Sequence, residues 1–190
     1  MSESHRQHTC PVWLGYFLLN PFRRFAQSPR RLLGPHVEEG MTVMDVGCAM
    51  GFFSLSLARL VGPSGRVVCV DMQEKMLEVL RRRAAKAGLT ERIEFRRCFA
   101  ESLEIAEYVG KVDFALAFAV VHEVSEPRRF IGEVAAGLKP GAKFLLAEPW
   151  GHVRKAEFEC TLRLAEESGL AVIRRPQIWA SRAALLQRPG

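Results

Sequence analysis

Two acidic residues that end strand-like runs, with a glycine-containing turn after the first, are the residues best suited to bind a ligand. Asp45 ends the run TVMD and is followed by Gly47 and Gly51, and Asp71 ends the next run, GRVVCVD. Glycines let backbone N–H groups approach a ligand closely. A carboxylate at the end of the second strand suits the two hydroxyls of an adenosine ribose. The turn and the acid in this order indicate a cofactor that contains adenosine.

The residues within the turn distinguish between such cofactors. The dinucleotide fingerprint G-x-G-x-x-G would require glycine where the chain has Ala49 and Phe52, and the Lys-Ser/Thr pair of a P-loop does not follow the turn. An acid two residues before the first glycine would repel a phosphate group. The same acid, Asp45, suits a cationic group such as the α-amino group of a bound methionine moiety.

A second set of polar residues follows the later strand-like runs. His122 and Glu123 come shortly after KVDFALAF, and Glu148 ends the run AKFLLAE. A histidine can act as a general base near neutral pH. It can equally cap a helix or form a structural hydrogen bond, and both roles are open here. Our catalytic candidates are His122 and Glu123, and His122 and Glu148 are candidates for contacts with a substrate.

Alternating strands and helices must position these residues. Buried apolar runs and amphipathic runs alternate from residue 41 onward, which favours parallel strands in a doubly wound α/β sheet with helices on both faces. The last two strands are only a few residues apart, which favours an antiparallel hairpin. The predicted strands are residues 42–47, 65–71, 92–98, 111–118, 142–149, 170–175 and 179–187. The predicted helices are residues 52–61, 73–87, 125–138 and 154–167.

The composition fits one compact domain. The chain has 190 residues, of which 48% are hydrophobic, and a formal net charge of +6. Its five cysteines are scattered and form no C-x-x-C pair, which is typical of reduced thiols in the cytoplasm. No apolar run reaches the roughly 18 residues of a membrane span, and no signal-peptide cleavage site follows the apolar run 12–19. We therefore expect a cytoplasmic protein without a membrane span.

The N-terminal segment, residues 1–36, contains aromatic residues followed by two Arg-Arg pairs. Three interpretations are open: a helix packed on the domain, a lid over the site, or an attachment to anionic lipid. We expect the lid, with Trp13 and Tyr16 in contact with the substrate, in front of a main domain at residues 37–190. The histidines of HRQHTC (5–10) form no tetrahedral ligand set, so no metal is predicted.

Taken together, these motifs resemble those of the class I S-adenosylmethionine-dependent methyltransferases of the small-molecule branch. VMDVGCAMG is similar to the family's first motif, with Ala49 in place of its middle glycine, and VVCVDM resembles the second. The run from VDFALAFAVVHEV to FLLAEP resembles the fourth strand through the fifth. The resemblance covers roughly residues 37–187. It implies a Rossmann-like, mostly parallel seven-stranded sheet, S-adenosyl-L-methionine as cofactor, and methyl transfer to a small-molecule acceptor.

The resemblance also implies which residues bind the cofactor. Asp71 would bind the ribose and Met72 would pack on the adenine. Many relatives carry Asp after the third strand, where this chain has Phe99, so adenine recognition would rest on stacking and on the Ala100 backbone. The predicted cofactor-binding residues are Asp45, Gly47, Cys48, Ala49, Gly51, Asp71, Met72, Phe99, Ala100, Glu101 and Phe118.

Two other functions are compatible with the same motifs. The positive net charge suggests an RNA methyltransferase, but ALAFAVVHEV lacks the Asn/Asp-Pro-Pro-aromatic loop in which the amino-methylating enzymes of DNA and RNA resemble one another, so we expect no nucleic-acid partner. The second alternative is a non-catalytic protein that binds S-adenosylmethionine, because a fold does not by itself determine an activity.

Overall fold

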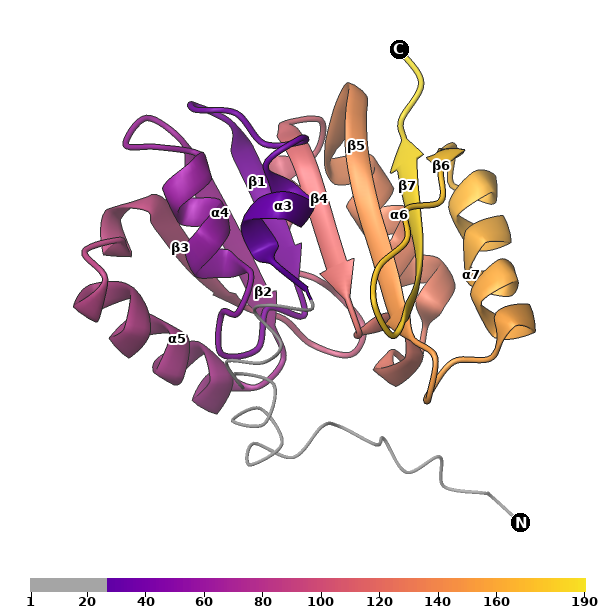
Figure 1. Cartoon of the computed structure of the whole chain (residues 1–190), viewed down its shortest axis with the longest axis horizontal. Helices are drawn as coiled ribbons and strands as arrows, with labels where there is room; N and C mark the ends of the chain where they lie inside the picture. The colour runs from indigo at the N-terminus through magenta and orange to yellow at the C-terminus, as the bar shows by residue number, and fades with distance from the viewer. Residues whose placement is uncertain (1–26) are drawn as a thin grey trace.

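The computed structural model describes residues 27–190, which contain one seven-stranded β-sheet (Figure 1). The strand order across the sheet is β3-β2-β1-β4-β5-β7-β6. The first five strands pair in parallel, whereas β7 is antiparallel to both β5 and β6. The strands are β1 (Thr42–Val46), β2 (Arg66–Asp71), β3 (Ile93–Arg97), β4 (Val112–Phe118), β5 (Leu138–Pro149), β6 (Ala171–Arg174) and β7 (Ser181–Gln187). The predicted fold class is confirmed, including the antiparallel hairpin at the C-terminal end.

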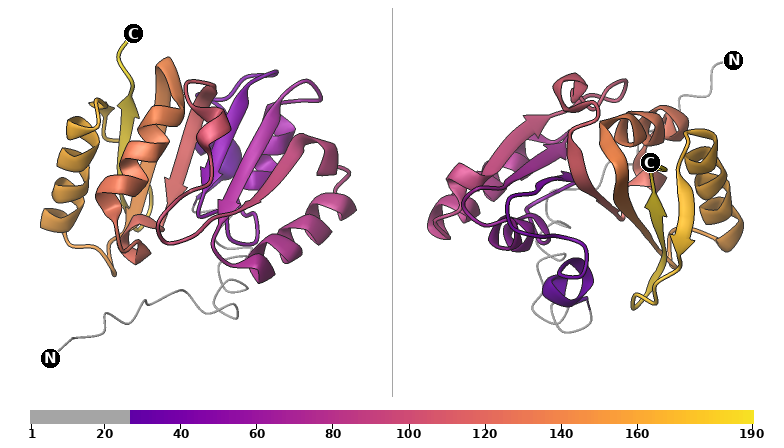
Figure 2. Two further views of the ribbon diagram at one scale, coloured as in Figure 1. Left: turned by 180° about the vertical axis from the view of Figure 1, so that it is seen from behind. Right: turned by 90° about the horizontal axis from the view of Figure 1, so that it is seen from above.

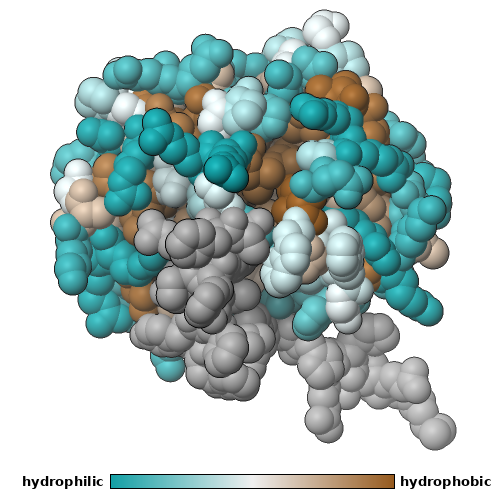
Figure 3. All heavy atoms as spheres, in the orientation of Figure 1, coloured by the Kyte–Doolittle hydropathy of each residue, from teal (hydrophilic) through white to brown (hydrophobic). Residues whose placement is uncertain are grey.

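Helices cover both faces of the sheet (Figure 2). Side chains of α3, α4 and α5 belong to one hydrophobic cluster, and side chains of α6 and α7 belong to the other. Alternate strand residues point to opposite faces, so Val43 packs with the first three helices and Met44 packs with the other two. The helices are α3 (Pro29–Leu33), α4 (Ser54–Leu60), α5 (Glu74–Lys86), α6 (Pro127–Gly137) and α7 (Lys155–Glu167). On the face turned to the viewer in Figure 3, the surface is largely polar, with scattered hydrophobic residues.

Most element boundaries differ from the predictions by one or two residues, and the start of β5 differs by four. Strand β5 begins at Leu138 rather than at residue 142. Its first residue pairs with Val112, and regular pairing resumes only between Phe114 and Lys143, so the Pro-Gly sequence in between interrupts the ladder without ending the strand. Helix α6 begins at Pro127 rather than at residue 125, because the fixed φ angle of proline suits the first turn of a helix.

The carboxyl ends of the parallel strands meet at the lower edge of the sheet in Figure 1. Strand β7 begins at this same edge, because Ser181 pairs with Pro149 at the end of β5. Ligands of doubly wound sheets bind beyond this carboxyl edge. The loops that follow β1, β2, β3, β4 and β5 therefore surround the candidate site. Within residues 27–190, no helix has the length and apolar character that crossing a membrane requires.

Candidate functional site

A pocket at the carboxyl edge, called here the first pocket, collects the loops that follow four strands. Its walls include residues 45–50 after β1, 71–73 after β2, 98–103 after β3 and 118–120 after β4. All of the predicted cofactor-binding residues except Gly51 line this pocket. Loops that are distant in the sequence thus line a single pocket.

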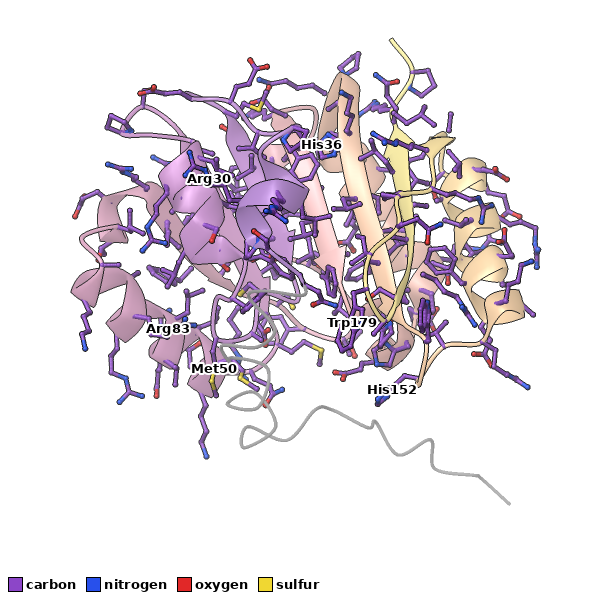
Figure 4. All side chains as sticks on the ribbon, in the orientation of Figure 1. Arg30, His36, Met50, Arg83, His152 and Trp179 are labelled. Carbon is purple, nitrogen blue, oxygen red and sulfur yellow. The ribbon has the colours of Figure 1, made fainter. Side chains whose placement is uncertain are left out.

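The turn after β1 requires glycine at two positions. Gly47 has a φ angle of +75°, and a Cβ atom there would lie 2.4 Å from a methyl carbon of Val120. Gly51 has a φ angle of +79°, and a Cβ atom there would lie 2.1 Å from a methyl carbon of Leu80. Gly51 therefore allows α5 to pack against the turn, which explains why it does not line the first pocket. The Arg83 guanidinium of α5 also donates a hydrogen bond to the Met50 carbonyl of the turn (Figure 4).

The carboxylate of Asp71 is held in place by two backbone N–H groups. Its Oδ2 atom accepts a hydrogen bond from Ala49 N–H at 2.8 Å, and its Oδ1 atom accepts one from Gln73 N–H at 2.9 Å. Ala49 has a φ angle of +45° in the left-handed region, where its N–H points at this carboxylate. Burial raises the pKa of Asp71, although the two backbone hydrogen bonds oppose the shift. Each carboxylate oxygen of Asp71 retains a lone pair that these bonds do not use, so this fixed carboxylate is suited to accept hydrogen bonds from a diol.

The second carboxylate, Asp45, is almost fully buried, with 2% of its surface exposed. It accepts a hydrogen bond of 2.5 Å from the Ser54 hydroxyl at the start of α4. Burial raises the pKa of Asp45 to about 7; the Ser54 hydrogen bond lowers this pKa and the nearby Asp71 raises it. A cationic group in the first pocket would therefore favour the ionised form of Asp45.

Two large apolar side chains of the first pocket are exposed. Met72 is 39% exposed and Phe99 is 53% exposed, and both line the pocket. Apolar surface of this kind offers a flat, water-excluding contact to a planar group such as a purine base. The two carboxylates and these two side chains together match the charges and shape of an adenosine that carries a cationic amino acid.

His122 lies outside the first pocket and lines a neighbouring one, called here the second pocket, together with Glu148 and His152. Val124 lines both pockets, so they share a wall. Glu123 lines the first pocket. The structure therefore places the two predicted catalytic residues, His122 and Glu123, in adjacent but different pockets.

Glu148 orients the His122 ring. The Glu148 side chain is 2% exposed, and its Oε2 atom lies 2.5 Å from Nδ1 of His122. Its Oε1 atom accepts hydrogen bonds from Val120 N–H at 3.2 Å and from Val121 N–H at 2.8 Å. Because these hydrogen bonds engage both carboxylate oxygens of Glu148, this residue fixes the position of the His122 ring through Nδ1. Burial lowers the pKa of His122, but the hydrogen bond and charge of Glu148 and the charge of Glu123 outweigh it, so the pKa is raised.

Some residues of the site escaped the sequence analysis, and others lie outside the described part of the chain. Trp13 and Tyr16 lie outside residues 27–190. Ser54 was missed, although a hydroxyl one turn beyond a glycine-containing loop is a usable signal for a partner of Asp45. His152 was also missed; its ring centroid lies 5.5 Å from that of His122. In the described residues, no group of three or more His, Cys, Asp or Glu side chains is arranged to hold a metal ion.

The chain is similar to known methyltransferases in sequence. A family profile described as "Methyltransferase domain" matches residues 37–179. The chain is 36% identical over 109 residues to the ubiquinone biosynthesis O-methyltransferase of Caulobacter vibrioides, covering 57% of this chain and 41% of that protein. It is 32% identical over 139 residues to the protein of the same name from Methylocella silvestris, covering 72% of this chain and 52% of that protein. The chain thus spans about half the length of these relatives or less.

The fold is also similar to that of solved structures. A SAM-dependent methyltransferase from Aquifex aeolicus superposes with a TM-score of 0.83 at 26% identity, covering 95% of this chain and 100% of that one. The cyclase SpnF superposes with a TM-score of 0.72 at 18% identity, covering 84% of this chain and 79% of that one. The second likeness shows the fold alone, so the reaction has to be argued from the residues of the two pockets.

Proposed function

We propose that this chain, which belongs to the class I S-adenosylmethionine-dependent methyltransferases, transfers a methyl group to a hydroxyl group of a small-molecule acceptor. The observation that carries the proposal is the buried Glu148, which holds His122 at the carboxyl edge beside the first pocket. A general base is useful for a hydroxyl, which must lose a proton as it is methylated. The name of the relatives, ubiquinone biosynthesis O-methyltransferase, agrees with an oxygen acceptor.

The first pocket fits S-adenosylmethionine. We assign Asp71 to the ribose hydroxyls, Asp45 to the methionine ammonium group, and Met72 and Phe99 to the two sides of the adenine. When bound, this cofactor supplies an electrophilic methyl group on a sulfonium. The chain's own contribution is to hold that methyl group in line with the acceptor oxygen and to keep water away.

In the second pocket, His122 is the proposed base. With its Nδ1–H donated to Glu148, the neutral ring leaves Nε2 free to accept the hydroxyl proton. Bound S-adenosylmethionine would supply the methyl group to the acceptor oxygen, and His122 would take the proton that the hydroxyl loses. Glu148 would stabilise the positive charge that His122 acquires with this proton. The Oε1 atom of Glu123 lies 3.9 Å from Nε2 of His122. We therefore propose that Glu123 lies where the bound cofactor meets the acceptor.

The expected lid, residues 1–36 with Trp13 and Tyr16, remains a proposal, and residues 1–26 of it lie outside the described part of the chain. It is supported by Gln27, whose side-chain amide donates to the Trp179 carbonyl at 3.0 Å and so brings the chain to the carboxyl edge. Removing residues 1–25 should abolish transfer and leave cofactor affinity within about twofold. A truncated protein that methylates at the full rate would refute the lid. We also propose a cytoplasmic location, because Cys48, Cys69 and Cys98 are buried free thiols.

Transfer of radioactive methyl from S-adenosylmethionine into a fractionated cell extract tests the proposal. We expect label in the low-molecular-weight fraction, in a product that base does not hydrolyse, as is typical of an aryl or alkyl ether. Label in the RNA fraction would indicate an RNA methyltransferase. Binding of cofactor without label in any fraction would indicate a non-catalytic binding protein. Asp71→Ala is the control, because it should remove the label at low cofactor concentration.

A further inference from the structure

Two basic side chains of the sheet have no acidic partner. Lys143 of β5 and Arg174 of β6 take part in no ion pair or side-chain hydrogen bond formed within residues 27–190. Lys139 and Arg175, which are close to them in the sequence, each pair with a carboxylate at 2.6 Å. The charges of Lys143 and Arg174 therefore remain available to an anion.

The strand register places these two residues on the same face of the sheet. Lys143 is paired with Phe114 of β4. Arg174 is paired with Leu185 of β7. Residues paired in register point to the same face, and Phe114 and Leu185 belong to the same hydrophobic cluster. Because β7 lies between β5 and β6, the two backbones are about 10 Å apart, a distance that two long side chains can span.

A histidine lies over the same face. The ring of His36, in the loop after α3, stacks on the Phe114 ring with the centroids 5.8 Å apart and the planes inclined by 11°. Burial lowers the pKa of His36, and the charges of Lys143 and Arg174 lower it further. Three side chains from three separate segments of the chain thus form one group, called here the basic cluster.

The His36 ring has one nitrogen atom that is open to a ligand. Its Nδ1 atom is buried and has no hydrogen-bond partner. A proton on Nδ1 would leave a buried N–H donor unpaired, which favours the neutral tautomer with the proton on Nε2. His36 is partly exposed, and no hydrogen bond among the described residues uses Nε2. The Nε2–H group is therefore a donor without an acceptor.

We propose that the basic cluster binds a phosphate group, either inorganic phosphate or a phosphate monoester. The two fixed charges of Lys143 and Arg174 match the two negative charges of such a group. A guanidinium donates parallel hydrogen bonds to phosphate oxygens, and an ammonium attracts the group as a point charge. The Nε2–H of His36 supplies a further donor. Without an anion, the two positive charges repel each other.

The basic cluster is separate from the two pockets at the carboxyl edge, since none of its three residues lines either of them. Phe118, at the end of β4, lines the first pocket, and Phe114 lies about 13 Å from it along the same strand. Figure 4 shows His36 over the upper part of the sheet and His152 at the opposite, lower edge. S-adenosylmethionine contains no phosphate, so the cluster indicates a second ligand.

An NMR titration of the imidazole Cε1–H resonances with inorganic phosphate tests the proposal. It is run at pH 8, where phosphate is mostly a dianion, and at constant ionic strength, so that screening does not change. The resonance of His36, identified by its loss in His36→Gln, should shift and saturate. The resonances of His122 and His152, which line the second pocket, should stay in place.

Single substitutions measure the contribution of each charge. Lys143→Gln and Arg174→Gln should each raise the Kd of phosphate about tenfold, because hydrogen bonds between charged groups are the strong ones. Lys86→Gln, which changes an exposed lysine in the last turn of α5, is the matched control and should leave the Kd unchanged. Phenyl phosphate distinguishes the two sources of the group, since a monoester site should bind it more tightly than inorganic phosphate.

A His36 resonance that phosphate does not move would overturn the proposal, and so would an unchanged Kd in both charge variants. Dimethyl phosphate, a diester with a single negative charge, should bind at least about fivefold more weakly than inorganic phosphate. Equal affinity for the diester would contradict a site for a dianion and would indicate a nucleic-acid backbone as the partner. Because the readout is binding, the result does not depend on methyl transfer.

Discussion

The two pockets at the carboxyl edge are built in different ways. The first pocket is made of short loops that each follow a parallel strand, and its key contacts, such as Ala49 N–H to Asp71, join neighbouring strands β1 and β2. The second pocket depends on contacts between the loop after β4 and the end of β5, such as His122 with Glu148 and Val121 N–H with Glu148. Loops that follow neighbouring strands thus form the proposed cofactor region, whereas the proposed acceptor region depends on contacts between segments that are distant in the sequence. We therefore expect substitutions in the two regions to change different measured quantities.

The largest effect on binding is expected at Asp71. Asp71→Ala removes the proposed acceptor of two ribose hydroxyls, and charge-assisted hydrogen bonds of this kind are the strong ones. The Kd of S-adenosylmethionine, measured by calorimetry, should rise by about 100-fold. Glu78→Gln, which changes an exposed carboxylate on α5, is the control and should leave the Kd unchanged. Equal affinities of Asp71→Ala and the unaltered protein would remove Asp71 from the cofactor site.

A smaller effect is expected at Glu148, and it concerns turnover rather than affinity. Glu148→Gln keeps an acceptor for the Val121 N–H but turns an N–H donor towards Nδ1 of His122, which favours the tautomer with the proton on Nε2. We expect kcat to fall by roughly 30-fold, a part of the 10² to 10⁴ that a general base supplies.

The pH profile of the same variant separates positioning from a loss of folding. Because Glu148 raises the pKa of His122, kcat of the unaltered protein should increase with pH until this raised pKa is passed. In Glu148→Gln the rise should occur at lower pH. A variant with lower kcat and an unshifted profile would show that Glu148 does not act through His122. Glu78→Gln, which lies outside both pockets, is again the control.

The smallest effect is a pH dependence of cofactor binding that comes from Asp45. With its pKa raised to about 7, this carboxyl is largely protonated at pH 6 and ionised at pH 8. If the cationic cofactor binds the ionised form, the affinity should increase by about tenfold between these values. In Asp45→Asn the affinity should be weaker and nearly independent of pH. An unaltered protein with the same Kd at pH 6 and pH 8 would contradict this assignment.

The same carboxyl predicts how stability changes with pH. In the unfolded chain Asp45 ionises near its ordinary pKa of about 3.9, whereas in the fold it keeps its proton to about 7. The protonated form is therefore favoured by folding, and the Asp45 contribution to the free energy of unfolding is lost as pH rises from about 4 to 7. Saturating cofactor should offset this loss, because it stabilises the ionised form. Thermal melting of the protein and of Asp45→Asn across this range measures the difference.

The sequence predicts the first pocket better than the second. The first pocket is formed by patterns that are local in the sequence, whereas the second depends on contacts between distant segments. Strand alternation and the turn around Gly47 are local patterns, so the sheet, the loop and the position of Asp71 could be predicted. The placement of His122 and Glu148 at one edge was also predictable, because both follow parallel strands. Their mutual contact was not, since the loop after β4 has to fold back towards β5 and only the tertiary structure specifies this.

The surroundings of Trp150 and Trp179 show the same limit. Trp150 and Trp179 are brought together by the antiparallel register that pairs Pro149 with Ser181. The sequence predicts a hairpin from the last two strands, but β7 inserts between β5 and β6, and this insertion sets the neighbours of Trp179. The exposure of an indole follows from packing and leaves no periodic signal in the sequence.

The most direct test of the central claim compares His122→Ala and Asp71→Ala by two measurements on the same preparations. These are the Kd of S-adenosylmethionine and the single-turnover rate of methyl transfer at saturating cofactor. We predict that His122→Ala lowers the rate by about 100-fold or more with Kd within twofold, and that Asp71→Ala does the reverse. An unchanged rate in His122→Ala, or a parallel loss of affinity and rate in both variants, would contradict the division into a cofactor region and an acceptor region.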